Sequence, residues 1–101
     1  MKEIDLTSEN FDEVVGSGDK ILVDFWAPWC GPCRMIAENL VDAVSEAKDV
    51  VLAKVNVDKE PSIADRFRIN AIPALKVFKG GKIVNEAVGY LNKEQILKLI
   101  K

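Results

Sequence analysis

Two cysteines separated by two residues lie where an apolar segment meets a helical pattern, and no other feature limits the possible folds as strongly. Cys30 and Cys33 follow the strand-like run from Ile21 to Trp26 and precede a helical pattern that begins at Arg34. A proline lies between them, and a proline in a first helical turn costs little because its missing N–H would have no partner there. The sequence therefore predicts a strand-to-helix junction with Cys30 as the N-cap residue.

The position of Cys30 at this predicted helix start indicates a reactive sulfur. Pro32 has no amide hydrogen, so the N–H of Cys33 is the natural donor to the Cys30 sulfur. The positive end of the helix dipole lies beneath the same sulfur and lowers the pKa of its thiol. We therefore expect Cys30 to be exposed, partly ionised at neutral pH and reactive.

Two other uses of the cysteine pair compete with dithiol redox chemistry. As a permanent crosslink the pair would close a loop of about four residues, which stabilises a fold by only about 2 kcal/mol on loop-entropy grounds. As a metal site it would supply two of the four ligands that zinc normally takes, and the sequence has no histidine and no further cysteine. A Cys-x-x-Cys pair near a strand–helix–strand pattern is typical of redox proteins, so we favour that interpretation.

Composition and charge exclude several classes of function. The chain has 101 residues, of which 49% are apolar, so we expect a single domain over residues 1–101 with one real core. Its 14 basic and 16 acidic residues are interspersed and offer no basic stripe for nucleic acid. The absence of histidine excludes catalytic triads that use imidazole. The sequence has no apolar run of membrane length and no signal-peptide layout at its start, so we expect a cytoplasmic protein away from membranes. In that compartment two close cysteines are expected to cycle between thiol and disulfide. We expect the protein to be a monomer.

Periodicity and turn residues divide the chain into alternating strands and helices. The segments between the first three strands have helical patterns and require crossovers, which predicts parallel pairing. The pair Gly80-Gly81 predicts an antiparallel hairpin near the end. We expect an α/β fold with one mixed five-stranded sheet flanked by helices on both faces. Strands are predicted at residues 2–6, 21–26, 50–57, 75–79 and 82–88, and helices from the cap at Thr7 to 15, over 31–48, over 61–67 and after Asn92.

Residue patterns at the helix ends predict two caps. Thr7 is predicted to cap the first helix, and Asn92 the last one, where Gln95 completes a capping box. Phe11 is expected to pack in the core. The last helix is expected to pack Ile96, Leu97 and Ile100 against the rest of the fold.

Two charged residues interrupt the strands predicted to be buried. Asp24 lies among apolar residues, and burial would raise the pKa of its carboxyl toward the range useful for proton transfer. Lys54 interrupts the next strand, and opposite charges in adjacent core strands can satisfy each other. The alternatives are a solvated aspartate on an edge strand and an outward-pointing lysine on an amphipathic strand.

The run from Asp24 to Ala37, Asp-Phe-Trp-Ala-Pro-Trp-Cys-Gly-Pro-Cys-Arg-Met-Ile-Ala, resembles the active-site signature of the thioredoxin family. Its Gly-Pro insert is similar to that of the thioredoxins proper rather than to the Gly-His form of disulfide isomerases. Further matches lie at residues 53–58, 72–73, 78–81 and 88–89, so the resemblance covers almost the whole chain. It implies a thioredoxin fold.

The resemblance also implies an activity and a set of residues. The chain would be a protein disulfide reductase that passes electrons from a thioredoxin reductase to disulfides of target proteins, with no cofactor or metal bound to the chain itself. Cys30 would attack the disulfide, and Cys33 would resolve the intermediate with help from Asp24 paired to Lys54. Pro73 would be cis and face the dithiol. Apolar or backbone-rich residues can hold many extended segments, so we expect a substrate surface of Trp29, Gly31, Pro32, Ile72, Pro73, Val88 and Gly89. Two tryptophans so close together are not both expected to be buried beside an exposed cysteine, and Trp26 is the one expected in the core.

Two alternatives stay open at this point. One is an oxidase or isomerase of a secretory compartment, against which the Gly-Pro insert and the missing signal segment count. The other is a binding or structural subunit with a thioredoxin fold, whose cysteines would be dispensable.

Overall fold

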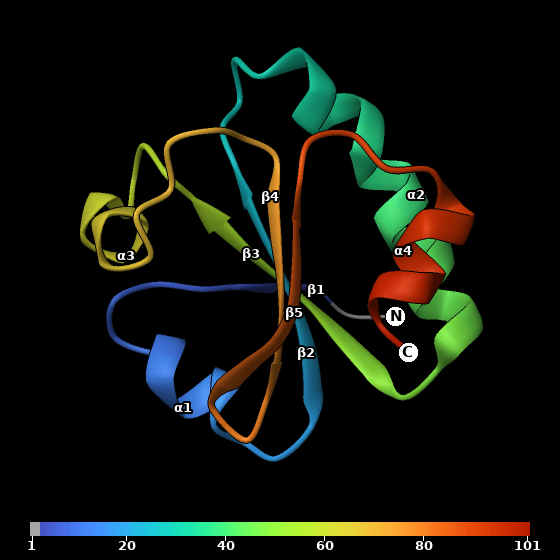
Figure 1. Cartoon of the computed structure of the whole chain (residues 1–101). Helices are drawn as coiled ribbons and strands as arrows, with labels where there is room; N and C mark the ends of the chain where they lie inside the picture. Colours follow the sequence, from blue (N-terminus) through green and yellow to red (C-terminus); the bar gives the residue numbers. More distant parts are fainter. Residues whose placement is uncertain (1–2) are drawn as a thin grey trace.

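The computed structural model describes residues 3–101, which form five strands and four helices (Figure 1). Most predicted elements are present, with ends that differ by one or two residues; position 2, where the first strand was predicted to begin, lies outside the described residues. No helix within residues 3–101 has the length and apolar character needed to cross a membrane. In chain order the elements are β1 (Glu3–Asp5), α1 (Phe11–Val15), β2 (Lys20–Trp26), α2 (Gly31–Ala47), β3 (Val50–Asn56), α3 (Pro61–Arg66), β4 (Ala74–Lys79), β5 (Lys82–Val88) and α4 (Lys93–Leu99).

The strands form one mixed sheet in the order β1-β3-β2-β4-β5. β1 and β2 run parallel to β3, whereas β4 is antiparallel to both β2 and β5. Figure 1 shows α2 and α4 on one face of the sheet and α1 and α3 on the other. The predicted five-stranded sheet with helices on both faces is therefore confirmed.

β2 is apolar almost throughout because both of its faces are covered. Leu22 packs with Ile36 and Leu40 of α2 on one face of the sheet. Phe25 belongs to the core on the other face, where it lies near an aromatic cluster. Within that cluster the rings of Phe11 and Phe67 have centroids 5.3 Å apart, and those of Phe11 and Phe78 are 5.8 Å apart. The prediction that Phe11 packs in the core is confirmed.

The predicted start of the first helix is wrong by three residues. α1 begins at Phe11, with Asn10 in the N-cap position, but the Asn10 side chain accepts no hydrogen bond from an amide of the first helical turn. Thr7 instead organises the preceding turn: its hydroxyl accepts the N–H of Glu9 at 3.2 Å, and its own N–H donates to Oδ1 of Asn10 at 2.7 Å. These bonds resemble a capping box, but they close a turn rather than a continuous α-helix.

The capping box predicted for α4 is present, and one core residue of this helix was missed. Oδ1 of Asn92 accepts the N–H of Gln95 at 2.9 Å, and Oε1 of Gln95 accepts the N–H of Asn92 at 2.9 Å. Leu97 packs against the core as expected but is only partly buried, whereas Leu99, which was not predicted, is buried. The reason is the helical spacing, which puts residues 96, 99 and 100 on one face.

Replacing Asn92 with alanine is expected to lower the free energy of unfolding by about 1 kcal/mol. The substitution leaves the N–H of Gln95 without its side-chain acceptor at the start of α4. Urea denaturation followed by circular dichroism measures the effect. Asn92→Asp is the control, since aspartate keeps an acceptor at the cap and should lose much less stability. Equal losses in both variants would contradict this assignment.

Candidate active site

Cys30 and Cys33 lie at the N-terminus of α2 in the arrangement predicted for them. Cys30 has an extended backbone in the N-cap position, and its sulfur accepts the N–H of Cys33 at 3.2 Å. The two sulfurs are joined in a disulfide, with Cα atoms 5.2 Å apart. Pro32 lies in the first helical turn, where an N–H would have no acceptor within the helix, so its absence costs no hydrogen bond. The amide and the helix dipole both favour negative charge on the Cys30 sulfur when the disulfide is reduced.

The expectation that Cys30 is exposed is wrong. Only 5% of the surface of Cys30 and 3% of the surface of Cys33 are accessible to solvent. The pair clusters with Ala27, and the half-buried side chains of Trp26, Val57 and Ile72 pack against this cluster. Little of the Cys30 surface is therefore available to a partner in the oxidised protein.

The loop before β4 lies beside the cysteines. The Cys30 sulfur is 3.9 Å from the carbonyl oxygen of Ile72, and the Ile72–Pro73 peptide bond is cis. The carbonyl of Pro73, a buried residue, accepts the N–H of Gly89 at 2.7 Å. The structure thus brings Ile72, Pro73 and Gly89 together near Cys30.

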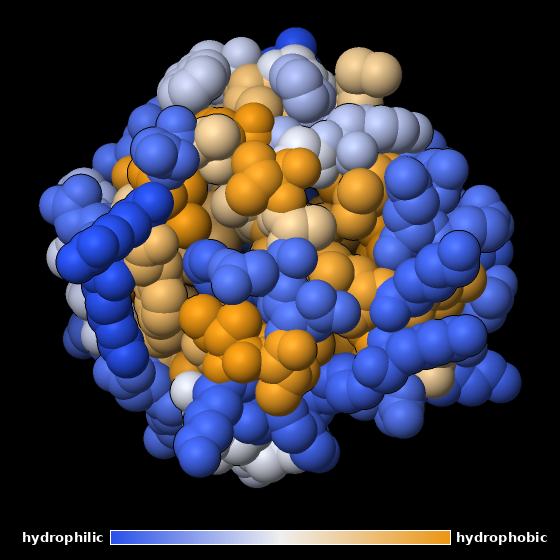
Figure 2. Space-filling view, viewed as in Figure 1, coloured by the Kyte–Doolittle hydropathy of each residue, from blue (hydrophilic) through white to orange (hydrophobic). Residues whose placement is uncertain are grey.

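Exposed apolar side chains surround this region. Val88 is 66% exposed and Trp29 is 68% exposed, as expected for Trp29, while Trp26 is half-buried rather than fully in the core. The indole N–H of Trp29 donates to Oδ2 of Asp58 at 2.9 Å, which holds the ring at the surface. A hollow of about 200 Å³ lies between Trp29 and Ile72. Figure 2 shows a group of exposed apolar residues among polar ones near the upper ends of β4 and β5 in this view.

A side-chain link that the sequence did not predict joins α2 to the segment after β5. Nδ2 of Asn39 donates to the hydroxyl oxygen of Tyr90 at 2.9 Å and to the carbonyl of Leu91 at 3.1 Å. Figure 1 shows this segment passing beside the first turns of α2. We call the pair of bonds the Asn39 bridge. It ties the helix that carries the cysteines to the segment that follows Gly89.

Asp24 is the one charged residue that is fully buried among residues 3–101, and neither of its carboxyl oxygens has a hydrogen-bond partner there. Oδ2 of Asp24 lies 3.9 Å from Nζ of Lys54, whose side chain is only 17% exposed. The expected pairing of the two residues in adjacent strands is confirmed. Burial raises the pKa of Asp24 to about 7; the Lys54 charge opposes this rise, and the negative charge of Glu3 adds to it.

The family model described as Thioredoxin matches residues 2–101. The chain belongs to the thioredoxin family. A thioredoxin from Alicyclobacillus acidocaldarius subsp. acidocaldarius is 47% identical over 92 residues, which cover 90% of this chain and 88% of the relative. A thioredoxin from Chlorobaculum thiosulfatiphilum is 45% identical over 98% of this chain and 94% of its own length.

Solved structures agree with this thioredoxin assignment. A thioredoxin variant from Halobacterium salinarum NRC-1 superposes with a TM-score of 0.88 at 31% identity, over 98% of this chain and 88% of that one. A chain from a study of thiol resolution in a yeast mitochondrial 1-Cys peroxiredoxin gives a TM-score of 0.89 at 30% identity, over 98% and 93%. Together with the Cys30–Cys33 pair, family membership makes the chain a thiol–disulfide oxidoreductase of the protein disulfide reductase type.

Proposed function

We propose that the chain carries electrons from a thioredoxin reductase to disulfides of target proteins, with Cys30 as the attacking residue and Cys33 as the resolving residue. The observation that carries this proposal is the N-cap position of Cys30, whose sulfur accepts the N–H of Cys33 at 3.2 Å. The same amide can stabilise a Cys30 thiolate in the reduced protein, because an ionised acceptor strengthens a hydrogen bond.

The reaction has two exchange steps. The Cys30 thiolate attacks one sulfur of a target disulfide, a mixed disulfide forms, and the other target sulfur leaves as a thiolate. The Cys33 thiolate then attacks the Cys30 sulfur, and the bond between Cys30 and the target breaks. The target leaves with both sulfurs reduced, and the chain is left with the Cys30–Cys33 disulfide. Two electrons have passed from the chain to the target.

Asp24 and Lys54 have supporting roles in the second step. A thiol must lose its proton before it can attack, and burial of Cys33 disfavours that loss. A carboxyl with a pKa of about 7 can accept this proton near neutral pH, directly or through a water molecule. The Lys54 ammonium stabilises the Asp24 carboxylate that is needed as the base.

The target would bind as an extended segment across the residues around the sulfur. The exposed side chains offer apolar contact area, and the backbone near Gly89 offers hydrogen-bonding groups that do not depend on the target sequence. Pro73 is buried, so it would support the residues of this surface rather than contact much of the target itself. The residues we assign to the surface are Trp29, Gly31, Pro32, Ile72, Pro73, Val88 and Gly89.

The remaining assignments follow from the same reaction. We propose a monomer of one functional domain in the cytoplasm, where a flavoprotein reductase using NADPH would reduce the Cys30–Cys33 disulfide again. The chain needs no cofactor or metal of its own for thiol–disulfide exchange, because the sulfurs carry both electrons.

The low exposure of Cys30 is the one observation that favours the alternative of a structural subunit with dispensable cysteines. A trapping experiment separates the two functions. Reduced Cys33→Ser should accumulate a covalent complex with insulin, seen on non-reducing gels and removed by dithiothreitol, because the first step proceeds and the second cannot. Cys30→Ser is the control and should trap far less. Absence of any complex with Cys33→Ser would contradict the proposed function and favour the structural subunit.

A further inference from the structure

The charges around Asp24 are contributed by three neighbouring strands. Asp24 of β2 and Asp5 of β1 are both register partners of Lys54 in β3, so the three residues form one row across the sheet. Glu3 precedes Asp5 by two residues and therefore has its side chain on the same face. Lys54 is thus flanked by carboxylates from both neighbouring strands.

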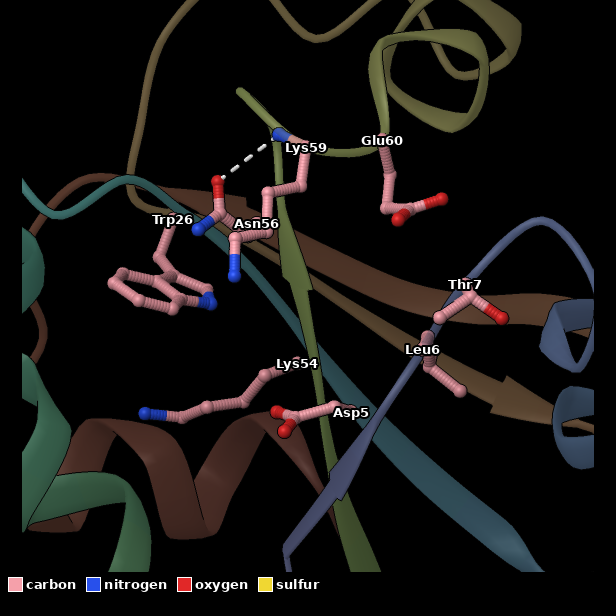
Figure 3. Close-up of a pocket in the computed structure, with 8 residues that line it drawn as sticks. All are labelled: Asp5, Leu6, Thr7, Trp26, Lys54, Asn56, Lys59 and Glu60. Carbon is pink, nitrogen blue, oxygen red and sulfur yellow. Dashed lines mark hydrogen bonds between the residues drawn. The ribbon is translucent and has the colours of Figure 1, made fainter.

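The Lys54 ammonium is shared unequally among these carboxylates. Its Nζ lies 3.4 Å from Oε1 of Glu3 and 3.9 Å from Oδ2 of Asp24. Figure 3 shows the Lys54 side chain extending away from the Asp5 carboxylate, with its Nζ below Trp26. Nζ is 5.7 Å from the centre of the Trp26 ring. The nearer carboxylate is therefore that of Glu3, which is 40% exposed, whereas the side chain of Asp24 is 1% exposed.

Within residues 3–101, Lys54 and Glu3 are the two charged groups that act on the Asp24 carboxyl. β4 puts the apolar Leu75 opposite Asp24, and the neighbouring Lys76 has its side chain on the other face, where it pairs with Glu86. Cys30 at the N-cap of α2 and Cys33 in its first turn carry no charge while they are joined in the disulfide. Since the Asp24 oxygens also lack hydrogen bonds within residues 3–101, the position of the Lys54 ammonium decides how well a carboxylate is tolerated there.

We propose that Glu3 is a positioning residue for the resolving step. It holds the Lys54 ammonium partly away from the Asp24 carboxyl. The buried carboxyl can therefore take up and release a proton near neutral pH. The inference rests on the proposed function, because it concerns the base that would serve Cys33. Full pairing with Lys54 would make Asp24 a stronger acid and a weaker base. The negative charge of Glu3 itself acts in the same direction as its hold on Lys54.

The test is a titration of the Asp24 carboxyl by carbon NMR in the oxidised full-length protein. Glu3→Gln should lower the pKa of Asp24 by about 0.5 to 1, because the ammonium is released toward Asp24 and one negative charge is removed. Asp5→Asn is the matched control: it removes the same charge from the same strand and face, but from a group that does not hold the ammonium. It should lower the pKa by less than half as much. Equal shifts, or no shift in Glu3→Gln, would overturn the proposal.

A second variant separates positioning from direct repulsion. In a Lys54→Met background, Glu3→Gln can act only by removing its own charge, so its effect on the Asp24 pKa should fall by at least half. An undiminished effect would overturn the positioning role. In single-turnover insulin reduction, Glu3→Gln should also move the pH midpoint of the resolving step downward by the same amount as the NMR titration. If the titration is unchanged while Cys30-dependent insulin reduction persists, this inference fails and the proposed function stands.

Discussion

Replacing either Cys30 or Cys33 with serine is expected to reduce catalysed insulin-disulfide turnover by about 100-fold or more, to the rate of the reductant alone. Cys30→Ser lacks the sulfur that would form the mixed disulfide. Cys33→Ser can form it once but cannot release the target. The measurement is NADPH oxidation in the presence of a thioredoxin reductase and insulin.

The serine variants need a control for folding and a readout for binding. Both should keep the wild-type circular dichroism spectrum, because a disulfide across so short a loop contributes little stability. A structural subunit would bind its partner equally well in both variants and would show no turnover in the wild type. Substantial turnover in Cys30→Ser would contradict the role we assign to that residue.

Asp24→Asn is expected to raise the free energy of unfolding by about 2 to 4 kcal/mol at pH 8 and to change it little at pH 4. Burial raises the pKa of Asp24 from 3.8 to about 7, so the folded chain keeps a proton that the unfolded chain releases between these values. The stability associated with this proton is fully present below pH 4 and is lost as the pH rises through 7. Asparagine, which does not ionise, avoids the loss.

Urea denaturation of the oxidised protein at several pH values measures this difference. Asp65→Asn is the control, because Asp65 is exposed and its replacement should leave the pH dependence unchanged. A constant difference between Asp24→Asn and wild type from pH 4 to pH 8 would contradict a raised pKa at Asp24. We expect wild type to lose stability relative to Asp24→Asn as the pH rises from 5 to 8. A relative gain in wild-type stability over this range would also contradict the prediction.

Features that depend on residues close in sequence could be predicted from the sequence. Cys30 caps α2 because Gly31 and Pro32 leave the Cys33 amide as the donor, and all four residues are adjacent. The capping box of Asn92 and Gln95 is equally local. The first helix start was missed because the Thr7 side chain can make the same kind of hydrogen bond in a turn as at a helix N-cap.

Features that depend on distant segments could not be predicted in the same way. The burial of Cys30 comes from Val57 and Ile72, which lie far along the chain from it. The bond from Trp29 to Asp58 spans 29 positions and that from Asn39 to Tyr90 spans 51. The hold of Glu3 on Lys54 depends on the register of β1 against β3, which a short edge strand does not reveal in its sequence.

The Asn39 bridge has a consequence for how targets are selected. Because the bridge joins α2 to the segment that follows Gly89, the proposed target-binding surface would be preorganised, with little freedom to adapt to a target. The conformational adjustment then falls on the target. Disulfides in strained or locally unfolded segments should react readily, whereas those locked in rigid cores should be passed over, so that selectivity reflects the plasticity of the substrate more than its sequence.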